Sequence, residues 1–170
     1  MIIRRQAKET LTAVEMMHGD RLDFRLVSGS TVAIELLQTG AEIVETNLGE
    51  PGVEEPGGRT VYRFWADCRI DGKEVRFGRE VGTQASFYEP WTVGGVRVWL
   101  DAVDEVFSFM RETHSPCRLQ ENCSHGKPPR RQARLALQDA SVRICPETVH
   151  PWCMLPEDGL RIENCYRGED

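Results

Sequence analysis

Apolar and polar residues alternate along much of the first 105 positions, which is the spacing of half-buried β-strands. Residues 21–27 follow this alternation, and residues 31–37 are rich in branched side chains. Ser28-Gly29-Ser30 and Thr39-Gly40 interrupt the pattern, as turns between antiparallel strands do. The pattern predicts strands over residues 21–27, 31–37, 41–46, 60–70, 73–77 and 96–103.

Local turn signals connect several of these strands. Asp71-Gly72 lies between two of them, and this dipeptide suits a type I′ hairpin turn, which needs positive φ at both central residues. Val93-Gly94-Gly95-Val96 predicts a second turn. Residues 50–58 contain two prolines and three glycines, so we expect a surface loop there.

The remaining segments are less regular. Residues 1–19 are interpreted as an N-terminal arm or a short helix, and residues 104–112 as a strand, although their spacing also suits a helix. Residues 113–132 are rich in proline and glycine and predict a loop. A final strand is expected at about residues 133–145, with a break near Asp139.

Together these elements predict an all-β fold. About eight or nine short strands without a strong helix are typical of an antiparallel β-sandwich or an open barrel. We expect the sandwich to occupy residues 20–112. Residues 113–170 would add the final strand and a Cys-rich, loop-like C-terminal tail that wraps the sandwich.

Composition narrows the class without naming an activity. The chain has 170 residues, of which 40% are hydrophobic and 28% charged, as in ordinary soluble domains and unlike disordered or collagen-like chains. No stretch approaches the roughly 20 apolar residues of a membrane helix, so no membrane span is expected. The net charge of −6 disfavours nucleic acid as a partner. The basic run at residues 127–131 is interpreted as a solvated loop.

Six cysteines bear on the compartment, five of them within residues 117–165. An even number in a turn-rich segment favours disulfides and an oxidising compartment. The disulfide candidates are Cys68, Cys117, Cys123, Cys145, Cys153 and Cys165. One alternative is a structural zinc ion, with candidate ligands His114, Cys117, Cys123, His125, Cys145, His150 and Cys153. Another is that the thiols are mostly free, and Cys68 in particular could remain a buried free thiol.

Catalytic signatures are missing from the sequence. It contains no phosphate-binding loop, no His-Glu-x-x-His and no Gly-x-Ser-x-Gly, so we expect no enzymatic activity of this chain by itself and no cofactor. Phe87, Tyr88 and Trp91 form an aromatic run that could bind sugar rings or a peptide at the rim of the sandwich. The other interpretation is a hydrophobic plug at one end. Trp65 and Trp99 lie within predicted strands and are expected to pack there.

Three runs resemble a known family. Residues 87–101, 140–153 and 159–170 are similar to the region upstream of the catalytic domain in bacterial lysostaphin-type zinc metallopeptidases. The resemblance implies an exported, envelope-associated parent protein that cuts peptidoglycan peptides. Those peptidases bind zinc through His-x3-Asp and His-x-His, and neither motif occurs here. The chain would then be the non-catalytic module.

The expected function is therefore an accessory or binding β-sandwich module of a secreted or envelope-associated metallopeptidase of the peptidoglycan-hydrolase type. Its partners would be a C-terminal peptidase domain, peptidoglycan or another envelope component. The alternative is a zinc-stapled intracellular binding or regulatory domain. Location outside the cell or in the envelope is expected, yet the N-terminus has no apolar run of signal-peptide type, which leaves the cytoplasm open.

Overall fold

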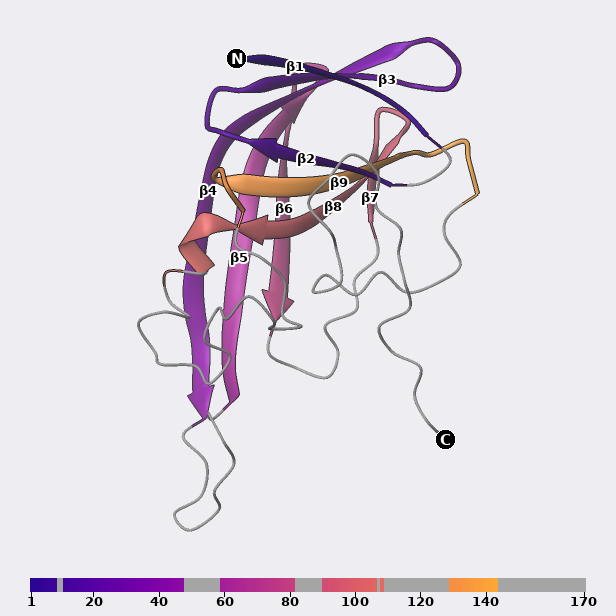
Figure 1. The fold of residues 1–170 in the computed structure, drawn as a ribbon. Coiled ribbons are helices and arrows are strands. Elements are labelled where there is room, and N and C mark those ends of the chain that lie inside the picture. The colour runs from indigo at the N-terminus through magenta and orange to yellow at the C-terminus, as the bar shows by residue number, and fades with distance from the viewer. Residues whose placement is uncertain (9–10, 48–58, 82–89, 107, 109–128, 144–170) are drawn as a thin grey trace, which may run out of the picture.

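The protein is built from two β-sheets that pack face to face, as a computed structural model shows for residues 1–8, 11–47, 59–81, 90–106, 108 and 129–143 (Figure 1). In this described part of the chain the strands are β1 (Ile2–Gln6), β2 (Thr12–Met16), β3 (Arg21–Arg25), β4 (Thr31–Asn47), β5 (Arg59–Ile70), β6 (Lys73–Val81), β7 (Trp91–Val93), β8 (Val96–Val103) and β9 (Ala133–Asp139).

The five-stranded sheet has the order β1-β3-β4-β5-β6, and the four-stranded sheet has the order β2-β9-β8-β7. β1 and β3 run parallel, whereas all other neighbouring pairs are antiparallel. The strands of the two sheets cross steeply, and the long strands β4 and β5 continue beyond the four-stranded sheet (Figure 1). The predicted all-β sandwich is therefore confirmed.

Both predicted hairpin turns are present. Asp71 and Gly72 have φ values of 44° and 84° between β5 and β6, and Gly94 and Gly95 have 59° and 82° between β7 and β8. Positive φ at both central residues is what a type I′ turn requires, and glycine adopts it without steric cost. Asp71 also accepts a hydrogen bond of 3.0 Å from the backbone N–H of Ala33, which joins the turn to β4.

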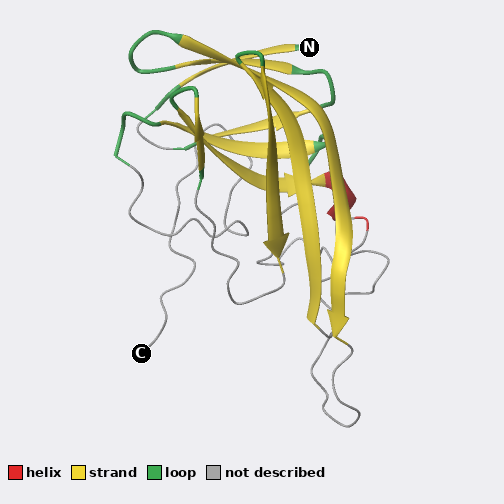
Figure 2. Cartoon of the chain, turned by 180° about the vertical axis from the view of Figure 1, so that it is seen from behind, coloured by secondary structure: helices red, strands yellow, loops and turns green. Residues whose placement is uncertain are grey.

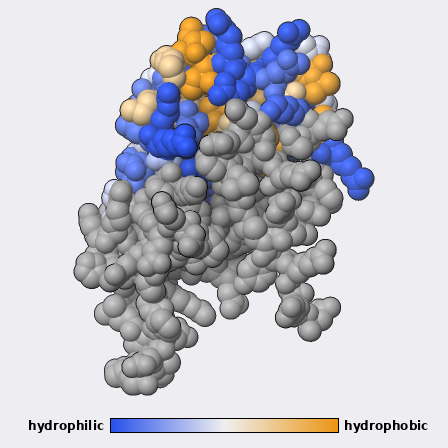
Figure 3. All heavy atoms as spheres, viewed as in Figure 1, coloured by the Kyte–Doolittle hydropathy of each residue, from blue (hydrophilic) through white to orange (hydrophobic). Residues whose placement is uncertain are grey.

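The hydrophobic core lies between the sheets and follows the alternation in the sequence. Its fully buried side chains include Leu22, Phe24, Ile34, Leu36, Phe77, Leu100 and Leu135. Burial of one such side chain contributes about 1.5–3 kcal/mol. The exposed large hydrophobic residues, such as Ile2 and Val27, are scattered, and hydrophilic residues separate the hydrophobic spots in the space-filling view (Figure 3).

The two central strands of the four-stranded sheet are buried on both faces. Every residue of β9 is buried. On β8, Val98 and Leu100 face the core, and Trp99, which lies between them on the opposite face of the strand, is also only 1% exposed. The expectation that Trp99 packs within a strand is confirmed. In the described part of the chain, no helix is long and apolar enough to cross a membrane.

Three local predictions are wrong. Residues 1–19 form neither an arm nor a helix but contribute β1 and β2, one to each sheet. Residues 104–106 and 108 are helical, where a strand was favoured. Thr39-Gly40 does not end a strand, because β4 runs through it for 17 residues. The predicted strand at 133–145 is correct for β9 but ends at Asp139, where the expected break lies.

Asp139 holds the end of β9 against the five-stranded sheet. Its carboxylate accepts hydrogen bonds from the backbone N–H of Val27 at 2.7 Å and from the N–H and hydroxyl of Ser141 at 2.8 and 2.6 Å. Burial of Asp139 favours the neutral acid, but these hydrogen bonds and the charge of Arg97 outweigh it and hold the pKa of Asp139 below its ordinary value.

Candidate functional site

The most structured exposed surface is the outer face of β4, β5 and β6, which we call the ladder face (Figure 2). A β-bulge in β4 sets its composition. Leu36 pairs with Cys68 and faces the core, and the next paired residue is Gln38, opposite Asp67. The extra residue, Leu37, shifts the alternation, so that Gln38 and Gly40 point outward.

The ladder face consists of four cross-strand rungs, each with one residue from β4, β5 and β6. The rungs are Glu35–Arg69–Glu74, Gln38–Asp67–Arg76, Gly40–Trp65–Gly78 and Glu42–Arg63–Glu80. Three of the rungs are held by side-chain hydrogen bonds or ion pairs across the strands. Arg63, for example, donates to Glu42 at 2.8 Å and to Glu80 at 2.6 Å.

The third rung is different because it places one tryptophan between two glycines. The indole of Trp65 lies directly over Gly40: a Cβ added to Gly40 would be 2.4 Å from Cζ2 and 2.6 Å from Cε2 of the ring. On the other side, a Cβ added to Gly78 would meet, within the described part of the chain, only the carbonyl oxygen of Phe64, at 4.0 Å. The ring therefore leans over β4, and no described side chain fills the space above Gly78 on β6. Trp65 itself is half-buried.

The second rung fixes three polar side chains beside this tryptophan. Arg76 donates from Nε and Nη2 to the two carboxylate oxygens of Asp67 at 2.6 and 2.7 Å, and Gln38 donates from Nε2 to Asp67 at 2.6 Å. The guanidinium carbon of Arg76 is also 5.4 Å from the centroid of the Trp65 ring, which is within cation–π range. The hydrogen bond from Arg76 lowers the pKa of Asp67 from its ordinary value, against the opposing effect of burial.

An open hollow adjoins the second rung. It has a volume of about 520 Å³ and is lined by Leu37, Gln38, Asp67, Glu74, Val75 and Arg76. Its lining combines two aliphatic side chains with four polar ones. Since Leu37 is the bulge residue, the irregularity in β4 contributes directly to the hollow.

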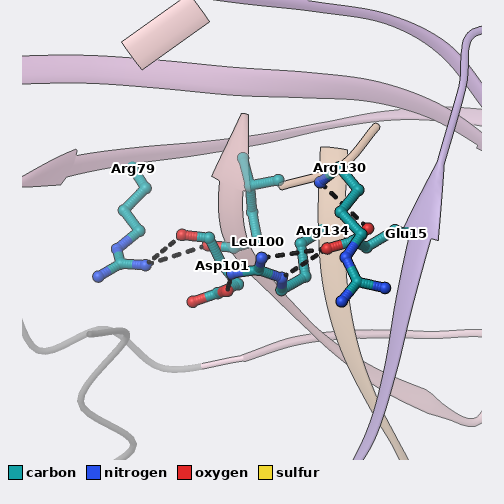
Figure 4. Close-up of polar contacts among 6 residues, drawn as sticks. All are labelled: Glu15, Arg79, Leu100, Asp101, Arg130 and Arg134. Atoms are coloured by element: carbon teal, nitrogen blue, oxygen red, sulfur yellow. Dashed lines mark hydrogen bonds and ion pairs between the residues drawn. The ribbon is translucent and has the colours of Figure 1, made fainter. Parts of the chain in front are cut away.

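A second polar cluster is buried in the four-stranded sheet (Figure 4). Arg134 of β9 forms ion pairs of 3.0 Å with Asp101 of β8 and with Glu15 of β2, and the side chains of Arg134 and Asp101 are only 3% and 2% exposed. Burial raises the pKa of Asp101 to about 6, although the charges of Arg134 and Arg79 act in the opposite direction. The backbone N–H of Arg130 donates to Glu15 at 3.1 Å.

Arg79 connects this cluster to the five-stranded sheet. Its guanidinium carbon lies 5.5 Å from the ring centroid of Phe64, and Nη1 donates to the backbone carbonyls of Leu100 and Asp101 at 3.2 Å each. The pairing of β8 with β9 shifts register between Leu100 and Ala102, which marks a β-bulge in β8. The two carbonyl oxygens that accept from Arg79 lie at this bulge. Because these charges are enclosed and engage one another, the cluster holds the sheets together and offers little contact to a ligand.

A third polar group spans the two sheets at one edge. Thr39 donates to Glu105 at 2.6 Å, and Nε2 of His18 lies 2.9 Å from the same hydroxyl. Gln132 accepts a hydrogen bond from the backbone N–H of His18. The side chains of His18, Thr39 and Glu105 are partly or fully exposed. They link the turn after β2, the middle of β4 and the short helical segment.

The predicted aromatic site is only partly within the described residues. Trp91 lies on β7 and packs against the core, with its ring centroid 5.2 Å from that of Phe77. This contact matches the plug interpretation for Trp91. Phe87 and Tyr88 lie outside the described residues.

The cysteine predictions divide in the same way. Cys68 was a disulfide candidate, but it is a free, fully buried thiol on the core face of β5. Burial raises its pKa to about 12. The other candidates for disulfides and for zinc lie outside the described residues: Cys117, Cys123, Cys145, Cys153, Cys165, His114, His125 and His150. Within the part of the chain that is described, no cluster of three potential metal ligands occurs.

Sequence reasoning missed the ladder face. The only signal in one strand was the alternation of Arg63, Trp65, Asp67 and Arg69, in which every second residue is polar or aromatic. The glycines on both sides of Trp65 come from other strands, and only the cross-strand register brings them together. Comparison of this chain with protein-family models, curated proteins and solved structures yields no significant match.

Proposed function

We propose that this chain is a non-catalytic binding module whose contact surface is the ladder face, and that it serves as the accessory module of a secreted or envelope-associated metallopeptidase of the peptidoglycan-hydrolase type. The observation that carries the binding role is the placement of the half-buried Trp65 between two glycines, beside the interlocked Gln38, Asp67 and Arg76. An aromatic face next to fixed polar groups provides affinity and orientation together.

The rigidity of this surface supports a binding role. Each polar side chain of the second rung is held by another, so little side-chain entropy remains to be lost when a ligand arrives. The surface also lies on the regular strands β4, β5 and β6, whose pairing holds its side chains in place. The link to an envelope peptidase is supported by the resemblance of residues 87–101, 140–153 and 159–170 to the upstream regions of lysostaphin-type enzymes.

Co-sedimentation with purified bacterial peptidoglycan sacculi tests this proposal. The wild-type chain is expected to pellet with the sacculi, and Trp65→Ala is expected to reduce the bound fraction at least fivefold. Arg25→Ala is the matched control, because Arg25 is exposed on β3 of the same sheet but outside the ladder face. No binding of the wild-type chain, or equal loss in both variants, would contradict the proposal.

A further inference from the structure

The space beside Trp65 indicates which kind of ligand the ladder face accepts. We infer that it is a neutral saccharide chain, with one sugar ring in the open space above Gly78, against the indole of Trp65, and the next toward the hollow at the second rung. This inference rests on the proposed binding function of the ladder face and adds the chemical class of its ligand.

The first argument is space. Gly78 is exposed, and among the described residues only the backbone oxygen of Phe64 lies within 4.0 Å of where its Cβ would be. A ligand cannot occupy the space over Gly40, because the indole ring of Trp65 fills it. The gap above Gly78 is therefore bordered by an aromatic ring on one side, and it opens at β6, which is the last strand of its sheet. An extended chain can cross the sheet at this point.

The second argument is charge. The four rungs contain five carboxylates and three guanidinium groups; the carboxylates belong to Glu35, Glu42, Asp67, Glu74 and Glu80, and the guanidinium groups to Arg63, Arg69 and Arg76. This excess of negative charge repels phosphates and acidic polymers. A cationic ligand is opposed at the ring itself, because Arg76 already lies 5.4 Å from its centroid. The face therefore favours an uncharged ligand.

The third argument is hydrogen bonding. A sugar hydroxyl both donates and accepts, so it is matched by a surface that offers a carboxylate, a guanidinium group and an amide close together. Asp67, Arg76 and Gln38 form such a group beside Trp65, and their mutual hydrogen bonds fix their orientations. The hollow of about 520 Å³ beside them has room for the neighbouring ring of the saccharide.

The experiment titrates the purified chain with chitopentaose and cellopentaose, followed by tryptophan fluorescence and by calorimetry, and screens a panel of neutral and anionic glycans. At least one neutral saccharide is expected to bind, with less than a twofold change in affinity between 50 and 500 mM NaCl. Trp65→Ala is expected to weaken binding at least tenfold. Gly78→Val fills the gap, leaves Trp65 in place and is expected to weaken binding to a similar degree. Arg25→Ala should bind as the wild-type chain does.

Two results would overturn the inference. One is that no neutral glycan binds at millimolar concentration, or that anionic glycans bind more tightly. The other is that binding survives in Gly78→Val with the fold intact by circular dichroism. If the wild-type chain binds sacculi through Trp65 but binds no free saccharide, the saccharide inference fails and the proposed function stands, with a peptide as the ligand. If sacculi are not bound at all, the proposed function fails first.

Discussion

Substitution of Gly40 by alanine tests whether the packing of Trp65 on β4 is as close as described. The new Cβ would lie 2.4, 2.6 and 3.1 Å from three carbons of the indole, where ordinary contacts are longer than about 3.4 Å. The indole ring of Trp65 must therefore shift by about 1 Å or rotate away from β4. Overpacking of this kind costs about 1–3 kcal/mol, whereas replacing glycine in a strand returns about 0.5–1 kcal/mol. We therefore expect a net loss of about 1–2 kcal/mol.

A double-mutant cycle isolates the contact. Urea unfolding is measured for the wild-type chain, Gly40→Ala, Trp65→Ala and the double variant. Once the ring is absent, Gly40→Ala should stabilise the protein by up to about 1 kcal/mol, so the coupling free energy should be about 2 kcal/mol. In thermal unfolding the single variant should melt about 2–4 °C lower for each kcal/mol lost.

Gly78→Ala is the matched control, since it changes the other neighbour of Trp65 and its Cβ meets no atom of the described residues closer than 4.0 Å. Its stability should equal or slightly exceed that of the wild-type chain. The reasoning is refuted if Gly40→Ala costs the same with and without Trp65, or if Gly78→Ala is as destabilising as Gly40→Ala.

Three further predictions concern buried groups. Cys68, with its pKa raised to about 12, should not react with a thiol reagent at pH 8 in the native protein and should react after denaturation; mass mapping of the labelled peptide checks this. Arg134→Met removes the cation between Glu15 and Asp101 and should cost about 3–5 kcal/mol in urea unfolding, and a variant as stable as the wild-type chain would contradict this. Asp139 has a lowered pKa, so its stabilising contribution is complete above its ordinary pKa of 3.8 and is lost as the pH falls through the lower folded value. Asp139→Asn should accordingly be less stable than wild type at pH 7 and lose less stability below pH 4, and parallel stability–pH curves would contradict this.

The hairpin of β5 and β6 was predictable because its signal is local. Asp71-Gly72 can form a tight turn without help from the rest of the chain, and the strands on either side alternate strongly. The turn at Gly94-Gly95 follows the same logic. Such turns depend on whether two adjacent residues can adopt positive φ, and this follows directly from their residue types.

Elements that depend on distant partners were not predictable in this way. β1 and β2 are five residues each, and β2 pairs with β9, more than 115 residues later in the chain. Glycine is rare inside strands, so the sequence alone predicts a break at Gly40, and only its position opposite Trp65 explains its presence within β4. The candidate site was missed for the same reason, since it is assembled by the register of three strands.

The position of β9 also has a consequence for the order of folding. The five-stranded sheet is complete once residue 81 has been made, whereas the four-stranded sheet needs residues 133–139 as the strand between β2 and β8. At about 5–20 residues per second on a ribosome, β8 waits about 2–7 s for that strand and β2 waits about 6–25 s. During this interval β2 has no partner in its sheet and β8 is paired only with β7, so both strands present open edges, which favour aggregation, until β9 emerges.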